Sequence, residues 1–339
     1  QTLWGSMEKH FSDPRLRQLF ARYATYCGSS PLQAPATLSL IAQVEMDGVW
    51  TIEGGMQELV RCLTRLCQQQ GVHFKYAVHC EQIQVQHGRV TGVKLENQEV
   101  LPADRVIFNG DVAALRQGLL GKPAQQAVTT RAPPRSLSAV TWCIRTRTRG
   151  LRLDRHNLFF QPDYAHEFTD IFHHRRLPRR PTVYLCAQDR PNPADNLGEE
   201  RLLCLVNAPA QGDQTELSAQ TLTDCESHIL SSVRQCGLDF ELTPFNHVRN
   251  TPQHFHRRFP ATGGALYGQA THGWMSIFSR PGAISPIPGL FLSGGSVHPG
   301  PGVPMAAMSG RLAAAAVRAS LGSIRSSPVG AISGGMSTP

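Results

Sequence analysis

The sequence of 339 residues contains no apolar run that approaches the roughly 18 residues of a membrane-spanning helix. We therefore predict no segment that spans a bilayer. The sequence also contains no C-x-x-C pair, and its nine cysteines are an odd number that lies mostly in apolar runs. This distribution is typical of reduced, buried thiols in a cytosolic protein and argues against a disulfide framework.

Metal ligands in a recognisable spacing are also missing. His254 and His256 alternate along a segment predicted as a strand, but no further ligand set accompanies them. A metal site needs three or four protein ligands. We therefore predict no metal site.

Charged residues are sparse, at 17% of the sequence, and the net charge is +8. The densest basic run is HHRRLPRRP, residues 173–181, and no nucleic-acid-binding motif accompanies it. We expect no nucleic-acid partner. The run is either a solvated surface loop or a contact to anionic lipid headgroups, near which each basic side chain gains about 1 kcal/mol.

Local patterns predict helices first, then strands. Asp13 and Pro14 suit the cap and first position of a helix that is stopped at Gly28, and EGGM (53–56) opens a second helix. Strands are predicted at 72–78, 83–85, 90–95 and 106–109. Further strands at 138–145, 158–161, 182–187 and 202–206, followed by a helix along 222–236, indicate an antiparallel sheet within residues 116–255.

The most informative stretch is SGGSVHPGPGVPMAAMSGRLAAAAV, residues 293–317. It follows a short apolar strand and places two glycines, Gly294 and Gly295, before a helix with Pro304 in its first turn. The N-terminus of such a helix favours an anionic or electron-rich group. The alternative is that the glycines only permit tight packing of the helix on the sheet.

Several segments together resemble one protein family. TIEGGMQELVRCLTRLCQQQGVHFKY and CEQIQVQHGRVTGVKL look like the second FAD-binding segment of the phytoene desaturase-type flavoproteins. RRFPATGGALYG and SRPGAISPIPGLFLSGGSVHPGPGVPMAAMSGRLAAAA look closer still to the 1-hydroxycarotenoid 3,4-desaturases, also called methoxyneurosporene or hydroxyneurosporene dehydrogenases. The resemblance extends from about residue 3 to residue 321.

The resemblance implies a mixed α/β fold and FAD as the cofactor. It implies a helical lid or substrate segment in residues 1–50, an incomplete Rossmann-like FAD-binding domain in 51–115 and 256–321, and a mainly antiparallel substrate domain in 116–255. Residues 322–339 are rich in Ser, Gly and Pro, and this composition predicts a disordered tail. The resemblance predicts that strands 106–109 and 290–293 lie parallel in one sheet. The cofactor-binding positions that it implies are Cys80, Asn109, Gly110, Gly294, Gly295, Ser296, Gly302, Val303, Pro304 and Met305.

One feature of the family is missing from the sequence. The family opens with a strand–GxGxxG–helix unit that holds the FAD diphosphate, and no GxGxxG occurs in these residues. The sequence also begins at Gln1 and not at a methionine. These two observations predict a C-terminal part of a longer protein, inactive by itself.

The implied function is FAD-dependent desaturation of a carotenoid, with 3,4-desaturation of a 1-hydroxycarotenoid as the specific reaction. A side chain cannot accept a hydride, so the reaction needs the redox cofactor. The sequence identifies no catalytic base, and His298 is better explained as a structural residue of its Pro/Gly turn. The alternatives are another flavin oxidoreductase, such as a carotenoid isomerase or an amine oxidase, and a non-catalytic carotenoid- or membrane-binding module.

The expected location follows from the substrate. A carotenoid dissolves in lipid, and no segment is predicted to span the bilayer. We therefore expect a cytoplasmic protein that associates peripherally with the membrane, with the basic run as a candidate contact. The sequence gives no indication of the oligomeric state.

Overall fold

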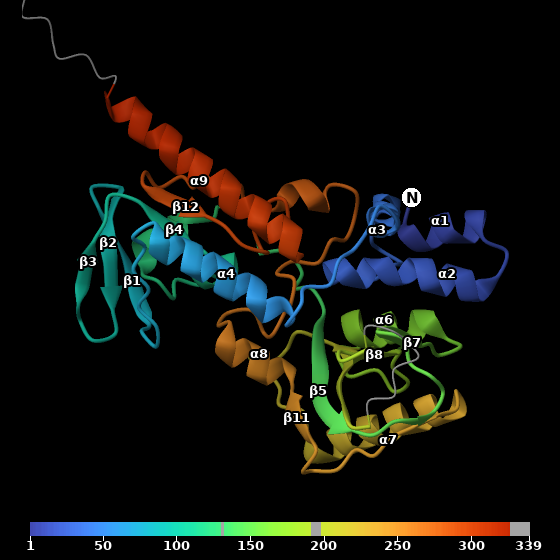
Figure 1. Cartoon of the computed structure of the whole chain (residues 1–339). Helices are drawn as coiled ribbons and strands as arrows, with labels where there is room; N and C mark the ends of the chain where they lie inside the picture. The colour runs from blue at the N-terminus through green and yellow to red at the C-terminus, as the bar shows by residue number, and fades with distance from the viewer. Residues whose placement is uncertain (130–131, 191–197, 326–339) are drawn as a thin grey trace, which may run out of the picture. The chain divides into compact units, whose positions relative to one another are not determined.

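The computed structural model describes residues 1–129, 132–190 and 198–325, and the chain divides into two compact units (Figure 1). The larger unit comprises residues 1–79 and 131–280, and the smaller comprises 80–130 and 281–339. These boundaries differ from the predicted domains, because 51–79 and 256–280 belong to the larger unit. The N–H of Leu266, for example, donates to the carbonyl of Leu137 at 3.0 Å and ties the later stretch to that unit.

The larger unit begins with short helices whose ends follow the predicted signals. The side chain of Asp13 accepts the N–H of Arg15 at 2.8 Å, Pro14 takes the first helical position, and Gly28 ends the segment in a left-handed conformation. The helices of this part are α1 (Leu3–His10), α2 (Pro14–Ala21), η1 (Arg22–Cys27), η2 (Ala36–Ser39), α3 (Leu40–Met46) and α4 (Met56–Gln69).

A five-stranded antiparallel sheet forms the centre of the larger unit, in the order β11–β5–β9–β8–β7. This arrangement agrees with the predicted antiparallel sheet. Its strands are β5 (Ser138–Thr146), β7 (His156–Phe159), β8 (Val183–Ala187), β9 (Glu200–Ala208) and β11 (His247–Asn250). The remaining elements of the unit are β6 (Arg149–Gly150), β10 (Leu238–Asp239), α6 (Tyr164–Phe172), α7 (Ala219–Gln235), α8 (Pro252–Arg258) and η4 (Ser276–Ser279).

The two faces of this sheet are covered differently. One face packs against α7, where Trp142 is fully buried and its indole N–H donates to Oε1 of Glu226 at 2.8 Å. The opposite face is covered at one end by α6, where Oε1 of Glu167 accepts a hydrogen bond from the amide of Asn207 on β9 at 2.8 Å. Glu167 also forms an ion pair with the buried Arg22, whose guanidinium lies 3.5 Å from the carboxylate. This one carboxylate therefore joins α6 to β9 and to the N-terminal helical segment.

The smaller unit combines an antiparallel sheet with a parallel strand pair. The antiparallel sheet has the order β1–β2–β3, and the parallel pair joins β12 to β4. The elements are β1 (Cys80–Gln86), β2 (Arg89–Leu95), β3 (Val100–Pro102), β4 (Val106–Phe108), α5 (Val112–Arg116), η3 (Lys122–Ala127), β12 (Leu290–Leu292) and α9 (Val303–Arg325).

Three predicted local structures are wrong. Residues 72–78 form no strand, although Val72, Phe74, Tyr76 and Val78 alternate, because the segment pairs with no strand of the described chain. The segment that carries His254 is the helix α8 and not a strand. The predicted disordered tail starts too early, because α9 continues to Arg325; residues 326–339 lie outside the described residues.

Candidate functional site

The carboxyl ends of β4 and β12 lie side by side in the smaller unit. The register pairs Leu290 with Val106 and Leu292 with Phe108, so the predicted parallel pairing is confirmed across about 180 residues of sequence. Beyond the last pair, the N–H of Ser293 donates to the carbonyl of Phe108 at 3.0 Å. Both strands therefore end together, which is where open α/β sheets bind ligands.

The glycine loop, residues 294–302, starts at this edge. Gly294 has a φ of +112°, and a Cβ there would lie 3.0 Å from Oδ1 of Asn109. Its N–H donates to the hydroxyl of Ser309 at 2.8 Å, and that hydroxyl donates to the carbonyl of Ala306 at 2.7 Å. Ser309 is fully buried in α9, so one side chain fastens the start of the loop to the helix that follows it.

Ser309 was not among the predicted site residues. The signal in the sequence is weak, because a single serine among alanines and glycines resembles an ordinary small residue of a packed helix. Only its burial beneath Gly294 shows its role.

Ser296 lies inside the loop and supports a second helix. Its hydroxyl accepts the N–H of Val112 at 3.1 Å, and the Asp111 side chain accepts the N–H of Ala113 at 2.8 Å, so both cap the short helix α5. Asn109 and Gly110 lie just before this cap, and Oδ1 of Asn109 accepts the hydroxyl of Ser293 at 3.2 Å. The structure thus brings the predicted residues 109–110 and 294–296 to one edge.

The end of the glycine loop is the start of α9. Gly302 has a φ of +109°, no atom lies within 4 Å of a Cβ placed there, and its carbonyl accepts the N–H of Ala306 at 2.8 Å. Val303 and Met305 are 57% and 39% exposed. This arrangement offers open backbone, apolar side chains and the positive end of a helix dipole, which fit a planar, electron-rich ring system.

Cys80 occupies a different place from the other predicted residues. It begins β1 in the antiparallel sheet, and its side chain packs against the apolar cluster that also contains Leu290 and Val297. Burial raises the pKa of its thiol, so the group is neutral near pH 7. Its contact with a cofactor remains a prediction.

The three histidines His254, His256 and His298 have structural partners. Nδ1 of His254 hydrogen-bonds the hydroxyl of Thr251 at 2.9 Å, and Nδ1 of His256 accepts the N–H of Gly263 at 3.3 Å. The backbone N–H of His298 donates to the carbonyl of Pro281 at 2.8 Å. Among the described residues, no group of three or more His, Cys, Asp or Glu side chains is arranged to hold a metal.

The larger unit contributes a second candidate surface. On the sheet side opposite α7, six side chains from neighbouring strands form what we call the open face: Cys143, Leu158, Tyr184, Leu203, Leu205 and Val248. All six are half-buried or exposed. A cavity of about 700 Å³ lies at one end of this face, lined among others by Cys143, Val248 and Phe245. Cavities of this size hold small organic ligands.

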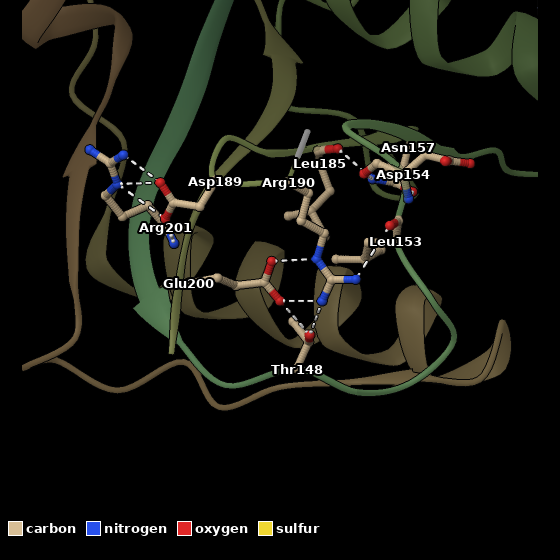
Figure 2. Close-up of polar contacts among 9 residues, drawn as sticks. All are labelled: Thr148, Leu153, Asp154, Asn157, Leu185, Asp189, Arg190, Glu200 and Arg201. Atoms are coloured by element: carbon tan, nitrogen blue, oxygen red, sulfur yellow. Dashed lines mark hydrogen bonds and ion pairs between the residues drawn. The ribbon is translucent and has the colours of Figure 1, made fainter. Parts of the chain in front are cut away.

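Polar contacts hold the end of this sheet where β8 ends and β9 begins. Figure 2 shows the Arg190 guanidinium bound to both carboxylate oxygens of Glu200, at 2.7 and 2.6 Å, while Thr148 donates to the same carboxylate at 2.6 Å. Arg190 and Glu200 are only 9% and 2% exposed. Burial acts to raise the pKa of Glu200, but these hydrogen bonds outweigh it and hold the pKa below its usual range. The second pair in Figure 2, Asp189 with Arg201, lies on the open side and is more exposed.

The family model for flavin-containing amine oxidoreductases matches residues 5–318. The chain belongs to this family. Membership confirms the predicted class of flavin cofactor and the mixed α/β fold. It also agrees with the apolar, backbone-lined loop at the carboxyl ends of β4 and β12.

Relatives with curated names are similar over nearly all of the chain. A hydroxyneurosporene desaturase from Rubrivivax gelatinosus is 57% identical over 340 residues, covering 99% of this chain and 64% of the relative. A 1-hydroxycarotenoid 3,4-desaturase from Flavobacterium sp. is 34% identical over 311 residues, covering 90% of this chain and 63% of the relative. The chain thus spans slightly less than two thirds of the length of these relatives.

Solved structures support the fold alone. An oxidoreductase from Methanosarcina mazei has a TM-score of 0.55 at 16% identity, covering 94% of this chain and 68% of that one. A putrescine oxidase variant has a TM-score of 0.51 at 13% identity, with the same coverage.

Proposed function

We propose that the complete protein is an FAD-dependent carotenoid desaturase whose substrate carries a hydroxyl group near one end. The proposal rests on the similarity to the hydroxyneurosporene desaturase across 99% of this chain. The structural observation that supports the proposal is the glycine loop. It places exposed backbone and the N-terminus of α9 at the point where β4 and β12 end. The open face supplies an apolar surface for a rod-like polyene.

The roles of the residues follow from their environment. When bound, the flavin supplies a hydride acceptor, which no side chain offers. Gly294 and Gly302 keep the backbone free of side chains, and the N-terminus of α9 favours negative charge nearby. Val303 and Met305 exclude water from the ring surface. No residue is assigned as the base that takes the proton.

The test uses the complete gene product, loaded with FAD and supplied with a 1-hydroxycarotenoid in detergent or lipid. Desaturation predicts a product two mass units lighter, with a longer polyene absorption. A product of unchanged mass would indicate an isomerase and overturn the proposal. Pigment binding without flavin or turnover would indicate a non-catalytic binding module.

We further propose that the protein is cytoplasmic and associates with the membrane from one side. In the part of the chain that the structure describes, no helix combines the length and apolar character needed to cross a membrane. The basic run supports a surface contact, but one of its arginines is used inside the protein. The Arg176 guanidinium pairs with the buried Asp170 at 2.7 Å and so has a structural role, whereas Arg175, Arg179 and Arg180 are exposed.

A further inference from the structure

The open face changes character from one edge of the sheet to the other. Cross-strand pairing places Val248, Cys143 and Leu203 in one row, and this row continues to Cys186 and His156. The next row contains Asn250, Thr141, Leu205, Tyr184 and Leu158, and so begins with two polar residues. Only along the first row do apolar side chains and cysteines lead from β11 toward β7, a distance of about 19 Å for four strand spacings. At the β7 end, His156 on β7 and Tyr184 on the neighbouring β8 form a polar pair.

We infer that Tyr184 and His156 form the subsite that binds the hydroxyl group of the substrate, at the polar end of the open face. This inference rests on the proposed function, because it names the part of the substrate that these side chains recognise. Apart from a hydroxyl, a polyene offers no strong hydrogen-bonding group. A site that selects a hydroxylated carotenoid therefore needs a polar pair beside an apolar surface, which is what β7 and β8 provide.

The pair is preorganised. The hydroxyl of Tyr184 and Nδ1 of His156 are 2.7 Å apart, and their rings are nearly parallel, with centroids 6.0 Å apart and an interplanar angle of 17°. Leu158 pairs directly with Tyr184 in the antiparallel register, so an apolar side chain is the cross-strand neighbour of the tyrosine. Holding the donor and the acceptor in place before binding reduces the entropy lost on binding.

The protonation states also suit a neutral alcohol. Burial, followed by the neighbouring Cys186, raises the pKa of Tyr184, so its phenol stays protonated and can both donate and accept. Burial and the adjacent Arg155 lower the pKa of His156, although Glu45 acts in the opposite direction. A neutral imidazole can then share one hydrogen bond with the phenol and leave the phenol's remaining capacity to the substrate.

Two side chains of the N-terminal helical segment act electrostatically on this pair. Glu45 acts to raise the pKa of His156, and Tyr26 contributes to the raised pKa of Tyr184. Glu45 is held by the hydroxyl of Tyr23, which donates to its Oε2 at 2.6 Å.

The experiment compares two carotenoids of equal skeleton and polyene length, one with the 1-hydroxyl and one without it. The complete gene product is loaded with FAD, and kcat/KM is measured for both. Tyr184→Phe and His156→Leu should each lower the hydroxyl-to-unhydroxylated ratio of kcat/KM roughly three- to tenfold, as expected for one lost hydrogen bond. His156→Gln, which keeps a hydrogen-bonding amide, should restore part of the ratio.

Tyr76→Phe is the matched control. It also removes one phenol hydroxyl, but Tyr76 is 70% exposed and stacks on Phe74, away from β7 and β8 in sequence. It should leave the ratio unchanged. Because both kcat/KM values come from the same variant, a lower fraction of folded protein reduces both equally and leaves their ratio unchanged. Equal loss of rate on both carotenoids in Tyr184→Phe would overturn the inference.

A binding measurement separates this inference from the proposed function. Quenching of tryptophan fluorescence gives Kd for both carotenoids without any turnover. If neither carotenoid is desaturated, the proposed function fails, yet a preference for the hydroxylated carotenoid that Tyr184→Phe abolishes would still support the subsite. Equal affinity of the unaltered protein for both carotenoids would overturn it.

Discussion

The glycine loop and the open face are built from different parts of the chain. At the loop, the working surface is backbone: Gly294 and Gly302 expose it, and the buried Ser309 fastens it to α9. At the open face, the working surface is side chains brought together by strand register. The two regions should therefore respond differently to substitution. At the loop, the effect should depend on whether the new residue tolerates the backbone conformation. On the sheet, it should depend on whether the side chain points toward α7 or toward the open face.

The largest expected effect tests whether the two faces of the five-stranded sheet differ. Leu202 points toward α7 and is 2% exposed, whereas its neighbour Leu203 lies on the open face. Leu202→Arg should lower the free energy of unfolding by more than about 4 kcal/mol, because it buries an unpaired charge. Leu203→Arg should cost less than about 1.5 kcal/mol and instead weaken carotenoid binding.

Urea denaturation and fluorescence quenching measure these two effects on the complete gene product. The same substitution at adjacent positions makes each variant the control for the other. Equal destabilisation by both would show that the open face is part of the packed core.

A second prediction concerns the buried ion pair of Arg190 and Glu200, where β8 ends and β9 begins. Arg190→Met should cost about 3–5 kcal/mol, because it leaves the Glu200 carboxylate buried without its partner. Asp189→Asn, which breaks the more exposed pair with Arg201, should cost less than about 1 kcal/mol. Thermal unfolding of both variants makes the comparison, and the double variant Arg190→Met with Glu200→Leu should recover much of the loss.

The same pair predicts the direction of a pH effect. The folded-state pKa of Glu200 lies below its usual range. The ionised carboxylate therefore makes its full contribution to the free energy of unfolding at pH values above the ordinary carboxyl pKa of about 4.3. It is lost as the pH falls through the folded-state pKa. Between pH 6 and pH 3, the free energy of unfolding should fall less in the double variant than in the unaltered protein.

A third prediction tests the backbone nature of the loop. Gly302→Val should lower flavin content at least tenfold, because a side chain would occupy the open space at the start of α9. It should cost only about 1–3 kcal/mol of stability, from the positive φ. Gly310→Ala, in the interior of α9, should leave flavin content unchanged and stabilise the helix by up to about 1 kcal/mol.

Flavin content is read from the absorbance of the purified complete protein. Full flavin in Gly302→Val would mean that the loop serves packing alone. That result would remove the contrast between the loop and the open face.

The smallest expected effect per residue concerns the basic run. Replacing Arg175, Arg179 and Arg180 by Ser should weaken binding to anionic vesicles by about 1 kcal/mol for each arginine that meets the surface. Added salt should weaken the binding of the unaltered protein in the same direction. Removing the same charge at Arg152, Arg257 and Arg258 is the control, and equal losses in both triple variants would reject a specific contact at the basic run.

The sequence by itself determined what depends on a few neighbouring residues. The Asp13 cap, the stop at Gly28 and the glycine loop before α9 were all predicted, because caps, left-handed turns and helix starts need particular residue types at fixed offsets. The resemblance added the parallel pairing of β4 with β12. Most of the predicted cofactor positions then lay together, because they belong to these local motifs.

The tertiary structure alone decided what depends on long-range pairing. Alternation in residues 72–78 is the pattern of a strand, but a strand forms only where a partner supplies its hydrogen bonds. The pairing of Ser309 with Gly294 and the rows of the open face could not be read from local patterns for the same reason. Strand register determines which side chains face each other, and it brought Tyr184 beside His156 from positions 28 residues apart.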